Sequence, residues 1–210
     1  MSRIQIESMA LGPVAANCYL VKNQDTGELL IIDAAASPER IRQKICDMQA
    51  VPKAILLTHG HYDHIGAVEV IRREYEIPVY CMEPEEEVLE SSRLNLSEMF
   101  GRPMTLKADQ LLKDGQKLEL AGLKLQALNT PGHTQGGGCY YFPENGILFS
   151  GDTLFCESVG RSDFPTGSAS VLVRSIREKL LVLPDETKVY PGHNDTTAIG
   201  WERDYNPFIG

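Results

Sequence analysis

The chain has 210 residues, of which 42% are hydrophobic, enough for one large domain or two small ones with a buried core. Its formal net charge of −9 argues against broad binding to nucleic acid, which requires Lys and Arg clustered on one face. No stretch approaches the roughly 18 apolar residues of a membrane helix, and the N-terminus lacks a basic region followed by an apolar run. We therefore expect a cytoplasmic protein that binds neither nucleic acid nor membranes.

Short segments of apolar or alternating character predict strands along most of the chain. In chain order they are Ile4–Glu7, Cys18–Lys22, Leu29–Asp33, Ala54–Thr58, Val79–Met82, Lys117–Leu120, Leu123–Asn129, Gly138–Phe142, Ile147–Ser150 and Lys188–Tyr190. The turns "NQDTGE" and "FPENGI" are typical of hairpins that join neighbouring strands.

Helical patterns lie between these strands. In "SPERIRQKICDMQ", Ser37 is the expected N-cap and Pro38 the first helical residue. The segments "IGAVEVIRREY" and "SASVLVRSIREKLL" place apolar residues three and four apart. Hairpins with interleaved helices predict an α/β fold, in which mixed sheets carry helices on their outer faces. We expect a single domain over residues 1–210, with 83–110 as a helical or irregular insertion.

The insertion is the part of the chain most able to roof a site as a lid. Its acidic run "EPEEEVLE" is interpreted as a solvated helix face. Tyr62, Met99 and Phe100 lie where loops are expected and can line a cleft, whereas Leu154 and Phe155 are more typical of core packing.

Histidine or aspartate follows directly after four of the predicted strands, in "AILLTHGHYDH", "LQALNTPGH", "ILFSGD" and "KVYPGH". All five histidines of the chain lie in these segments. Groups at strand ends converge on one rim of a layered fold, so we expect a shared site there. In a backbone that is extended after a strand, residues i and i+2 point the same way, so His59 and His61 can hold one ion. Asp63 and His64, at the mouth of the next helix, can face a second ion.

The candidate metal ligands are His59, His61, Asp63, His64, His133, Asp152 and His193. They are too many for one tetrahedral ion but fit two divalent ions that share a carboxylate and a water. Imidazole and carboxylate suit zinc, and also iron or manganese. A single buried histidine is usually a hydrogen-bonded core residue, but this spaced pattern has no comparable structural explanation. Asp33 is interpreted as a carboxylate that accepts hydrogen bonds from backbone N–H groups; at most it contacts a residue that binds the metal, and not the metal itself.

At these residues the chain resembles the metallo-β-lactamase superfamily, whose signature reads "THGHYDH" here. The resemblance extends from the N-terminal hairpin to "ERDYNPF" and implies an αββα sandwich with the metals at one edge of the two sheets. It also implies that His59, His61 and His133 bind the first metal ion. Asp63, His64 and His193 would bind the second, and Asp152 would bridge both.

Within the superfamily, "GDTLFCESVGRSDFPTGS" is similar to a segment of glyoxalase II (hydroxyacylglutathione hydrolase) and its short bacterial relatives. This similarity implies a small-molecule thioester as substrate, with Arg161 as a contact to it. Asp63 would orient the attacking hydroxide, which the two ions would generate at neutral pH. Glyoxalase II binds glutathione with a further C-terminal helical domain, for which we expect no counterpart within residues 1–210, so glutathione as part of the substrate stays open.

Several other activities stay open as well. Persulfide dioxygenase, with a single iron, has a "GR-x-D-F" stretch similar to Gly160–Phe164. Lactonase, phosphodiesterase and ribonuclease relatives share the histidine signature, although the negative net charge disfavours ribonuclease. A non-catalytic metal-binding module is a third class, and the sequence does not fix the oligomeric state.

Overall fold

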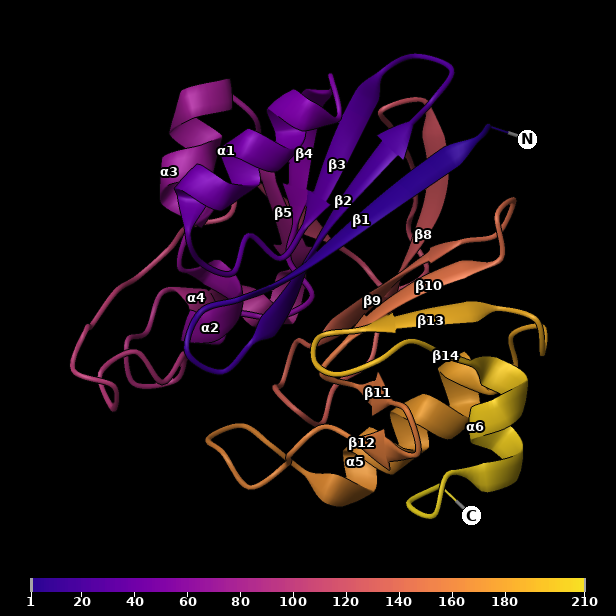
Figure 1. Ribbon diagram of the computed structural model, residues 1–210. Helices are drawn as coiled ribbons and strands as arrows, with labels where there is room; N and C mark the ends of the chain where they lie inside the picture. Colours follow the sequence, from indigo (N-terminus) through magenta and orange to yellow (C-terminus); the bar gives the residue numbers. More distant parts are fainter. Residues whose placement is uncertain (1, 210) are drawn as a thin grey trace.

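The computed structural model describes residues 2–209, and two six-stranded sheets form its centre (Figure 1). The first sheet has the order β1-β2-β3-β4-β5-β6: Ile4–Leu11, Ala16–Asn23, Glu28–Ile32, Val51–Leu56, Val79–Met82 and Gln110–Leu112. The second has the order β14-β13-β10-β9-β8-β7: Thr197–Ala198, Lys188–Pro191, Ile147–Gly151, Gly138–Phe142, Leu123–Asn129 and Lys117–Leu120. β11 (Leu154–Phe155) and β12 (Ser158–Val159) form a separate small ribbon.

Helices cover the outer faces of both sheets (Figure 1). α1 (Pro38–Asp47) and α3 (Val68–Tyr75) pack on the first sheet, and α5 (Ala169–Ser175), its π-helical continuation η2 (Ile176–Leu180) and α6 (Ile199–Tyr205) pack on the second. The short helices α2 (Tyr62–Ile65), η1 (Glu83–Glu85) and α4 (Glu86–Leu89) lie at one edge. The predicted αββα sandwich is confirmed. Within residues 2–209, no helix is long and apolar enough to cross a membrane.

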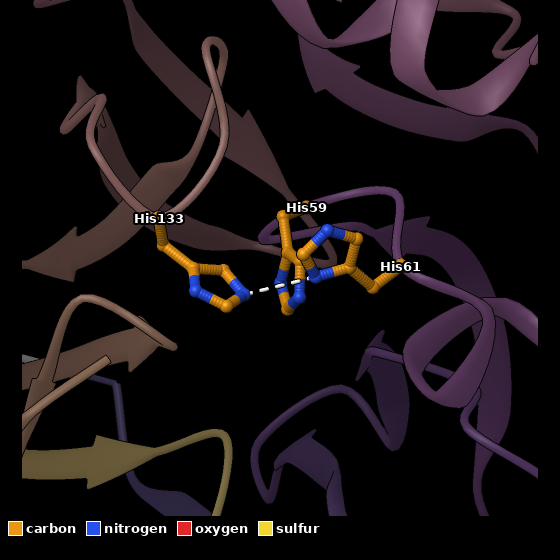
Figure 2. Close-up of side chains that lie close together, drawn as sticks. All are labelled: His59, His61 and His133. Atoms are coloured by element: carbon orange, nitrogen blue, oxygen red, sulfur yellow. Dashed lines mark hydrogen bonds between the residues drawn. The ribbon is translucent and has the colours of Figure 1, made fainter. Parts of the chain in front are cut away.

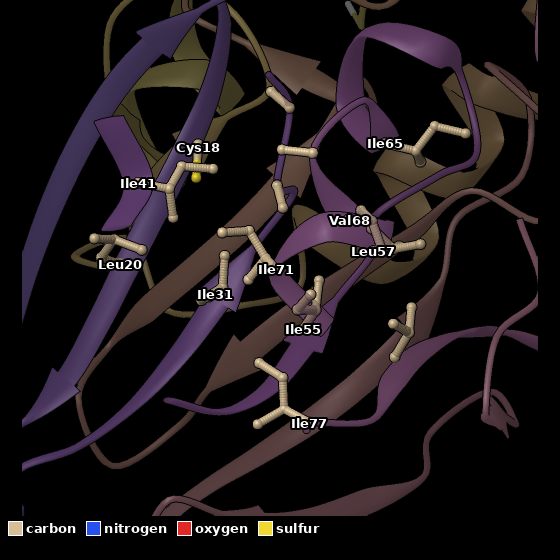
Figure 3. Close-up of a cluster of buried hydrophobic side chains, with 14 of the residues drawn as sticks. Cys18, Leu20, Ile31, Ile41, Ile55, Leu57, Ile65, Val68, Ile71 and Ile77 are labelled. Atoms are coloured by element: carbon tan, nitrogen blue, oxygen red, sulfur yellow. The ribbon is translucent and has the colours of Figure 1, made fainter. Parts of the chain in front are cut away.

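Three apolar layers hold these elements together. In the first, Ile31 and Ile55 of the sheet meet Ile41 of α1 and Ile71 of α3 (Figure 3). A second layer fills the space between the sheets with side chains such as Tyr140, Phe142 and Phe149, and a third lies under α5 and α6. Because β3 and β4 are parallel strands inside the sandwich, Leu29–Ile32 and Ala54–Leu56 are buried and form continuous apolar runs rather than alternating ones.

The sequence locates most strands within a few residues, and both predicted hairpin turns are confirmed between β2 and β3 and between β9 and β10. Ser37 is the N-cap of α1 and Pro38 its first residue, as predicted, but Ser37 has a left-handed φ of 52° and its side chain makes no capping hydrogen bond. The helix predicted from Ile65 breaks near Gly66 into α2 and α3. Strands β6, β11, β12 and β14 and helix α6 were not predicted, because most are too short to show a periodic pattern.

The segment 83–110 differs from its prediction in two respects. The last residue of the segment, Gln110, is the first residue of strand β6. Since β6 pairs in parallel with β5, Gln110 belongs to the first sheet. The acidic run within the segment is not a uniformly solvated face, because Glu85, Val88 and Leu89 are all fully buried. Val88 and Leu89 lie three and four residues after Glu85, as expected for side chains on one buried face of a helical turn.

Tyr140 offers a test of the contact between the sheets. Its hydroxyl is buried in the second layer and donates a hydrogen bond of 2.7 Å to the carbonyl of Leu57, the residue that follows β4 of the other sheet. We expect Tyr140→Phe to lower the free energy of unfolding by about 1 kcal/mol, because it leaves that carbonyl without its donor. Urea unfolding measures this change. Tyr205→Phe, at a residue that is 59% exposed, is the control, and equal stability of Tyr140→Phe and wild type would contradict the assignment.

Candidate metal centre

The first candidate cluster lies where β4 and β8 end. The chain bends after Thr58 so that His59 and His61 face the same point, and His133 reaches it from the loop that follows β8 (Figure 2). One ligand atom from each of the three imidazoles lies within 4.8 Å of the others. His133 Nε2 is 2.9 Å from His61 Nδ1, and all three side chains are buried.

The second candidate cluster consists of Asp63 and His64 of α2 and His193 from the loop after β13. His64 Nε2 lies 3.3 Å from His193 Nε2. Asp63 Oδ2 lies 3.6 Å from His64 Nε2 and 3.4 Å from His193 Nε2. The three groups therefore surround one point, as the positions of Asp63 and His64 at the start of a helix predicted.

Asp152, which follows β10, lies between the two clusters. Its Oδ2 is 3.5 Å from His133 Nε2 of the first cluster, and its Oδ1 is 3.5 Å from His64 Nε2 of the second. Gly192 makes this approach possible, because a Cβ at that position would collide with Asp152 Oδ1 and His64. A carboxylate that faces both clusters can ligate a cation in each of them.

The donor atoms fit divalent cations. Two ligands at tetrahedral positions around zinc, each about 2.0–2.1 Å from it, are about 3.3 Å apart, close to the separations in both clusters. Within residues 2–209, His59 Nε2, His61 Nε2 and Asp152 Oδ1 are buried without any hydrogen-bond partner. Buried polar atoms normally have a partner, and a cation would provide one here. Imidazole and carboxylate donors without thiolate suit zinc, iron and manganese alike.

The two clusters differ in charge. Burial, together with the surrounding imidazoles, holds the pKa of His59 and His61 well below the usual value, so both are neutral and offer lone pairs. Burial also opposes protonation of His64, but Asp63, Asp152 and Asp33 outweigh it and raise its pKa to about 10. For Asp63, burial is outweighed by His64 and His193, which keep the pKa of its carboxyl below the usual range. A cation in the second cluster would thus replace the proton of His64.

Hydrogen bonds behind the clusters orient the imidazoles. Asp33 Oδ1 accepts the Thr58 backbone N–H at 2.8 Å, as its interpretation as a backbone acceptor predicted. In addition, Asp33 Oδ2 lies 2.9 Å from His64 Nδ1, which turns Nε2 of that ring toward Asp63 and His193. The Nδ1 of His133 donates to the Arg161 carbonyl at 2.6 Å. Such partners fix the tautomer and the direction of a ligating histidine.

Glu85 is a supporting residue that the sequence prediction missed. Its Oε1 accepts a hydrogen bond from the Gly60 N–H at 2.7 Å. Its Oε2 accepts hydrogen bonds from the Thr134 hydroxyl at 2.8 Å and from the Gly136 N–H at 2.9 Å. One buried carboxylate thereby joins the loop of His59 and His61 to the loop of His133. Burial raises its pKa to about 8, against the effect of the three donors. The helical spacing of Glu85 with two apolar residues was the signal that could have revealed it.

Arg161 lies beside the first cluster, with its side chain exposed. Its guanidinium makes two hydrogen bonds to Asp163, of 2.9 and 2.7 Å, and its Cζ lies 4.1 Å from the centre of the Phe164 ring. The Phe164 ring is 5.8 Å from that of His61. Arg161 is therefore close to the site but paired with an acidic neighbour, and its contact with a substrate stays a prediction. Leu154 is fully buried, in accord with core packing.

The independence of the clusters can be tested by removing one ligand from each. We expect His133→Ala and His193→Ala each to reduce the bound metal from about two ions per chain to about one, because each substitution leaves the other set of donors intact. Elemental analysis of dialysed protein gives the ratio. Asp204→Asn, which changes an exposed carboxylate, should retain both ions. Loss of all metal from both variants, or of none, would contradict two separate clusters.

Glu85 has a predictable effect on stability. Its folded-state pKa of about 8 lies above the usual 4.5, so the folded chain holds this proton more tightly than the unfolded chain. The stability that results is present below about pH 4.5 and is lost as the pH rises toward 8. In metal-free protein, the stability advantage of wild type over Glu85→Gln should therefore shrink between about pH 5 and pH 8.5. Urea midpoints at the two pH values measure it, and a constant difference would be inconsistent with this titration.

Comparison with known proteins agrees with this geometry. The family model of the metallo-beta-lactamase superfamily matches residues 11–193. The probable metallo-hydrolase YqgX of Bacillus subtilis is 40% identical over 96% of this chain and 95% of its own length. The hydroxyacylglutathione hydrolase GloC of Haemophilus influenzae is 34% identical over 98% of both chains.

Solved structures give the same result. The crystal structure of BLEG-1 B3 metallo-beta-lactamase superposes with a TM-score of 0.93 at 40% identity, over 98% of this chain and 99% of the other. A di-iron-bound form of TTHA1623 superposes with a TM-score of 0.86 at 36% identity, over 96% and 99% of the two chains. This chain belongs to the metallo-β-lactamase superfamily.

Proposed function

We propose that this protein is a metal-dependent hydrolase that cleaves a small-molecule thioester at a site for two divalent ions. The observation that carries the proposal is the position of Asp152, whose two carboxylate oxygens each lie 3.5 Å from an imidazole of a different cluster. Two sites joined by a carboxylate are typical of binuclear hydrolases. The names of two relatives, a probable metallo-hydrolase and a hydroxyacylglutathione hydrolase, support the reaction class and the thioester.

The ligands proposed for the first ion are His59, His61 and His133, and those for the second are Asp63, His64 and His193, with Asp152 shared. Ions held there would supply Lewis acidity, which lowers the pKa of a coordinated water and stabilises an oxyanion. We propose zinc as the ion. Iron is the alternative, because the similar protein TTHA1623 has a di-iron-bound form.

Asp63 is proposed to orient the attacking water. Its carboxylate has only a small exposed fraction, 14%, and its Oδ2 lies 3.6 Å from His64 Nε2 and 3.4 Å from His193 Nε2. The attacking water would release one proton to solvent, and Asp63 would accept a hydrogen bond from the O–H of the remaining hydroxide and so direct an oxygen lone pair toward the thioester carbonyl carbon. The new C–O bond gives a tetrahedral species, and its collapse breaks the C–S bond. The thiolate is a good leaving group and takes its proton from solvent, so the protein needs no general acid.

Turnover of thioesters tests the proposal. We expect zinc-loaded protein to hydrolyse S-lactoylglutathione or a simpler acyl thioester, and we expect Asp63→Asn to lower kcat by about 10²–10⁴ because it removes the orienting carboxylate. Release of free thiol measures the rate, with Asp204→Asn as control. Absence of activity toward a broad thioester panel, together with turnover of a chromogenic cephalosporin, would contradict the thioester assignment in favour of a lactam.

A persulfide dioxygenase is the second candidate, because the "GR-x-D-F" stretch lies beside the first cluster, with Phe164 against His61. That activity needs one iron with open positions for a sulfur and for oxygen. One iron per chain and oxygen consumption on addition of a persulfide, without thiol release from thioesters, would select it over the hydrolase.

A further inference from the structure

A cleft of about 870 Å³ opens beside Asp63, on the side of the second cluster. Its walls come from parts of the chain that are distant in sequence: the turn between β1 and β2, the segment after β3, and residues 100–104 of the loop between α4 and β6. Pro13, Ala36 and Tyr62 give it an apolar lining. Its volume is typical of sites for small molecules.

The loop that closes this cleft is held firmly at its base. Asn95 Nδ2 donates to the Met104 carbonyl at 2.8 Å, and Ser97 Oγ accepts the Met104 N–H at 2.9 Å. Both polar side chains are buried. The Asn95 carbonyl in turn accepts the Tyr62 N–H at 2.9 Å, which joins the loop base to the helix that carries Asp63 and His64. Residues 99–103 are therefore the tip of a pinned loop that stands next to the candidate metal centre.

An aromatic pair forms one wall of the cleft. The rings of Tyr62 and Phe100 stack with centroids 4.3 Å apart at an angle of 27°. Phe100 is 52% exposed, although it lies next to a candidate active site. The Tyr62 hydroxyl is buried, and no residue between 2 and 209 gives it a hydrogen bond. A flat apolar group bound here would cover ring surface that is now exposed.

Arg102 lines the same cleft. Among residues 2–209 its guanidinium has neither an ion pair nor a hydrogen bond, in a chain with a net charge of −9. Arg161, by contrast, is already paired with Asp163. An unpaired guanidinium beside an apolar wall matches a carboxylate, to which it can make two parallel hydrogen bonds.

We propose that this cleft is the substrate-recognition subsite, and that it selects substrates with a flat apolar arm that ends in a carboxylate. The arm would lie against Tyr62 and Phe100, its carboxylate would pair with Arg102, and the thioester would lie at the end formed by Asp63. This inference deepens the proposed function and rests on it for the position of the reacting group.

A pair of substrates that differ only at the end of the arm tests the subsite: the S-acetyl thioesters of 4-(mercaptomethyl)benzoate and 4-(mercaptomethyl)benzamide. Hydrolysis of each adds water across the C–S bond and gives acetate and the thiol. Wild type should show a kcat/KM about tenfold higher for the benzoate, the effect of one charged hydrogen-bonded pair. Arg102→Gln should reduce this ratio to about one, and Phe100→Ala should lower kcat/KM for both substrates by about threefold to tenfold.

Arg93→Gln is the matched control, because Arg93 lies in the same loop and is exposed but does not line the cleft. It should keep the tenfold preference. Equal kcat/KM values for the two substrates in wild type, or equal losses in Arg93→Gln and Arg102→Gln, would overturn the subsite and leave the hydrolase intact.

Binding gives a readout that does not depend on turnover. In metal-loaded protein, NMR titration with 4-methylbenzoate and 4-methylbenzamide should show tighter binding of the benzoate to wild type and loss of that difference in Arg102→Gln. If neither of these two thioesters is hydrolysed although another thioester of the panel is, the proposed function stands and this titration decides the subsite. If no thioester of the panel is hydrolysed, the proposed function fails, and this titration still decides the subsite. Benzoate binding that is unchanged in Arg102→Gln would place the carboxylate elsewhere and contradict the inference.

Discussion

The structure depends on one constraint: the two sheets pack so that the ends of β4, β8, β10 and β13 meet at a single edge (Figure 1). This packing buries imidazoles and carboxylates next to one another, and some of their atoms, such as His59 Nε2 and Asp152 Oδ1, lack a hydrogen-bond partner within residues 2–209. Buried polar atoms without partners cost about 1–3 kcal/mol each, so the apolar layers must outweigh them. A bound cation removes that cost, because it supplies the missing partners.

The supporting carboxylates explain how the ligands keep their geometry. Asp33 and Glu85 are both buried, and each fixes a ligand-bearing segment through side-chain hydrogen bonds rather than strand pairing: Asp33 holds His64 of α2, and Glu85 joins two loops. Asp33 links the end of β3 to Thr58 and to the imidazole of His64, whereas Glu85 links the loops of the two sheets to each other. Loops that carry ligands lack the hydrogen-bond ladder of a strand, so buried side chains must take over that role.

The two sides of the site differ in electrostatics. On the side of the first cluster, Arg161 is neutralised by Asp163 and packs over Phe164. On the side of the second cluster, Arg102 has no such partner within the described part of the chain, and it stands at an apolar wall. Two divalent ions with two aspartates would leave an excess of positive charge between these sides. An acidic protein can thus present a local positive potential to an anionic substrate.

The sequence by itself determined most of the longer strands, their combination with covering helices, and the positions of His59, His61 and His133 after strands, because these depend on local periodicity and on spacing within a few residues. The αββα class followed from the resemblance of "THGHYDH" to the metallo-β-lactamase superfamily. It also placed Asp33 as an acceptor of backbone N–H groups. Only the tertiary structure decided the burial of Glu85 and the pairing of β6 with β5. It alone brought Phe100 against Tyr62. The pairing of β6 with β5 and the contact of Phe100 with Tyr62 join residues that lie far apart along the chain, so no local pattern encodes them. The spacing of Glu85 with Val88 and Leu89 indicates a buried face, but only the fold sets which loops this carboxylate contacts.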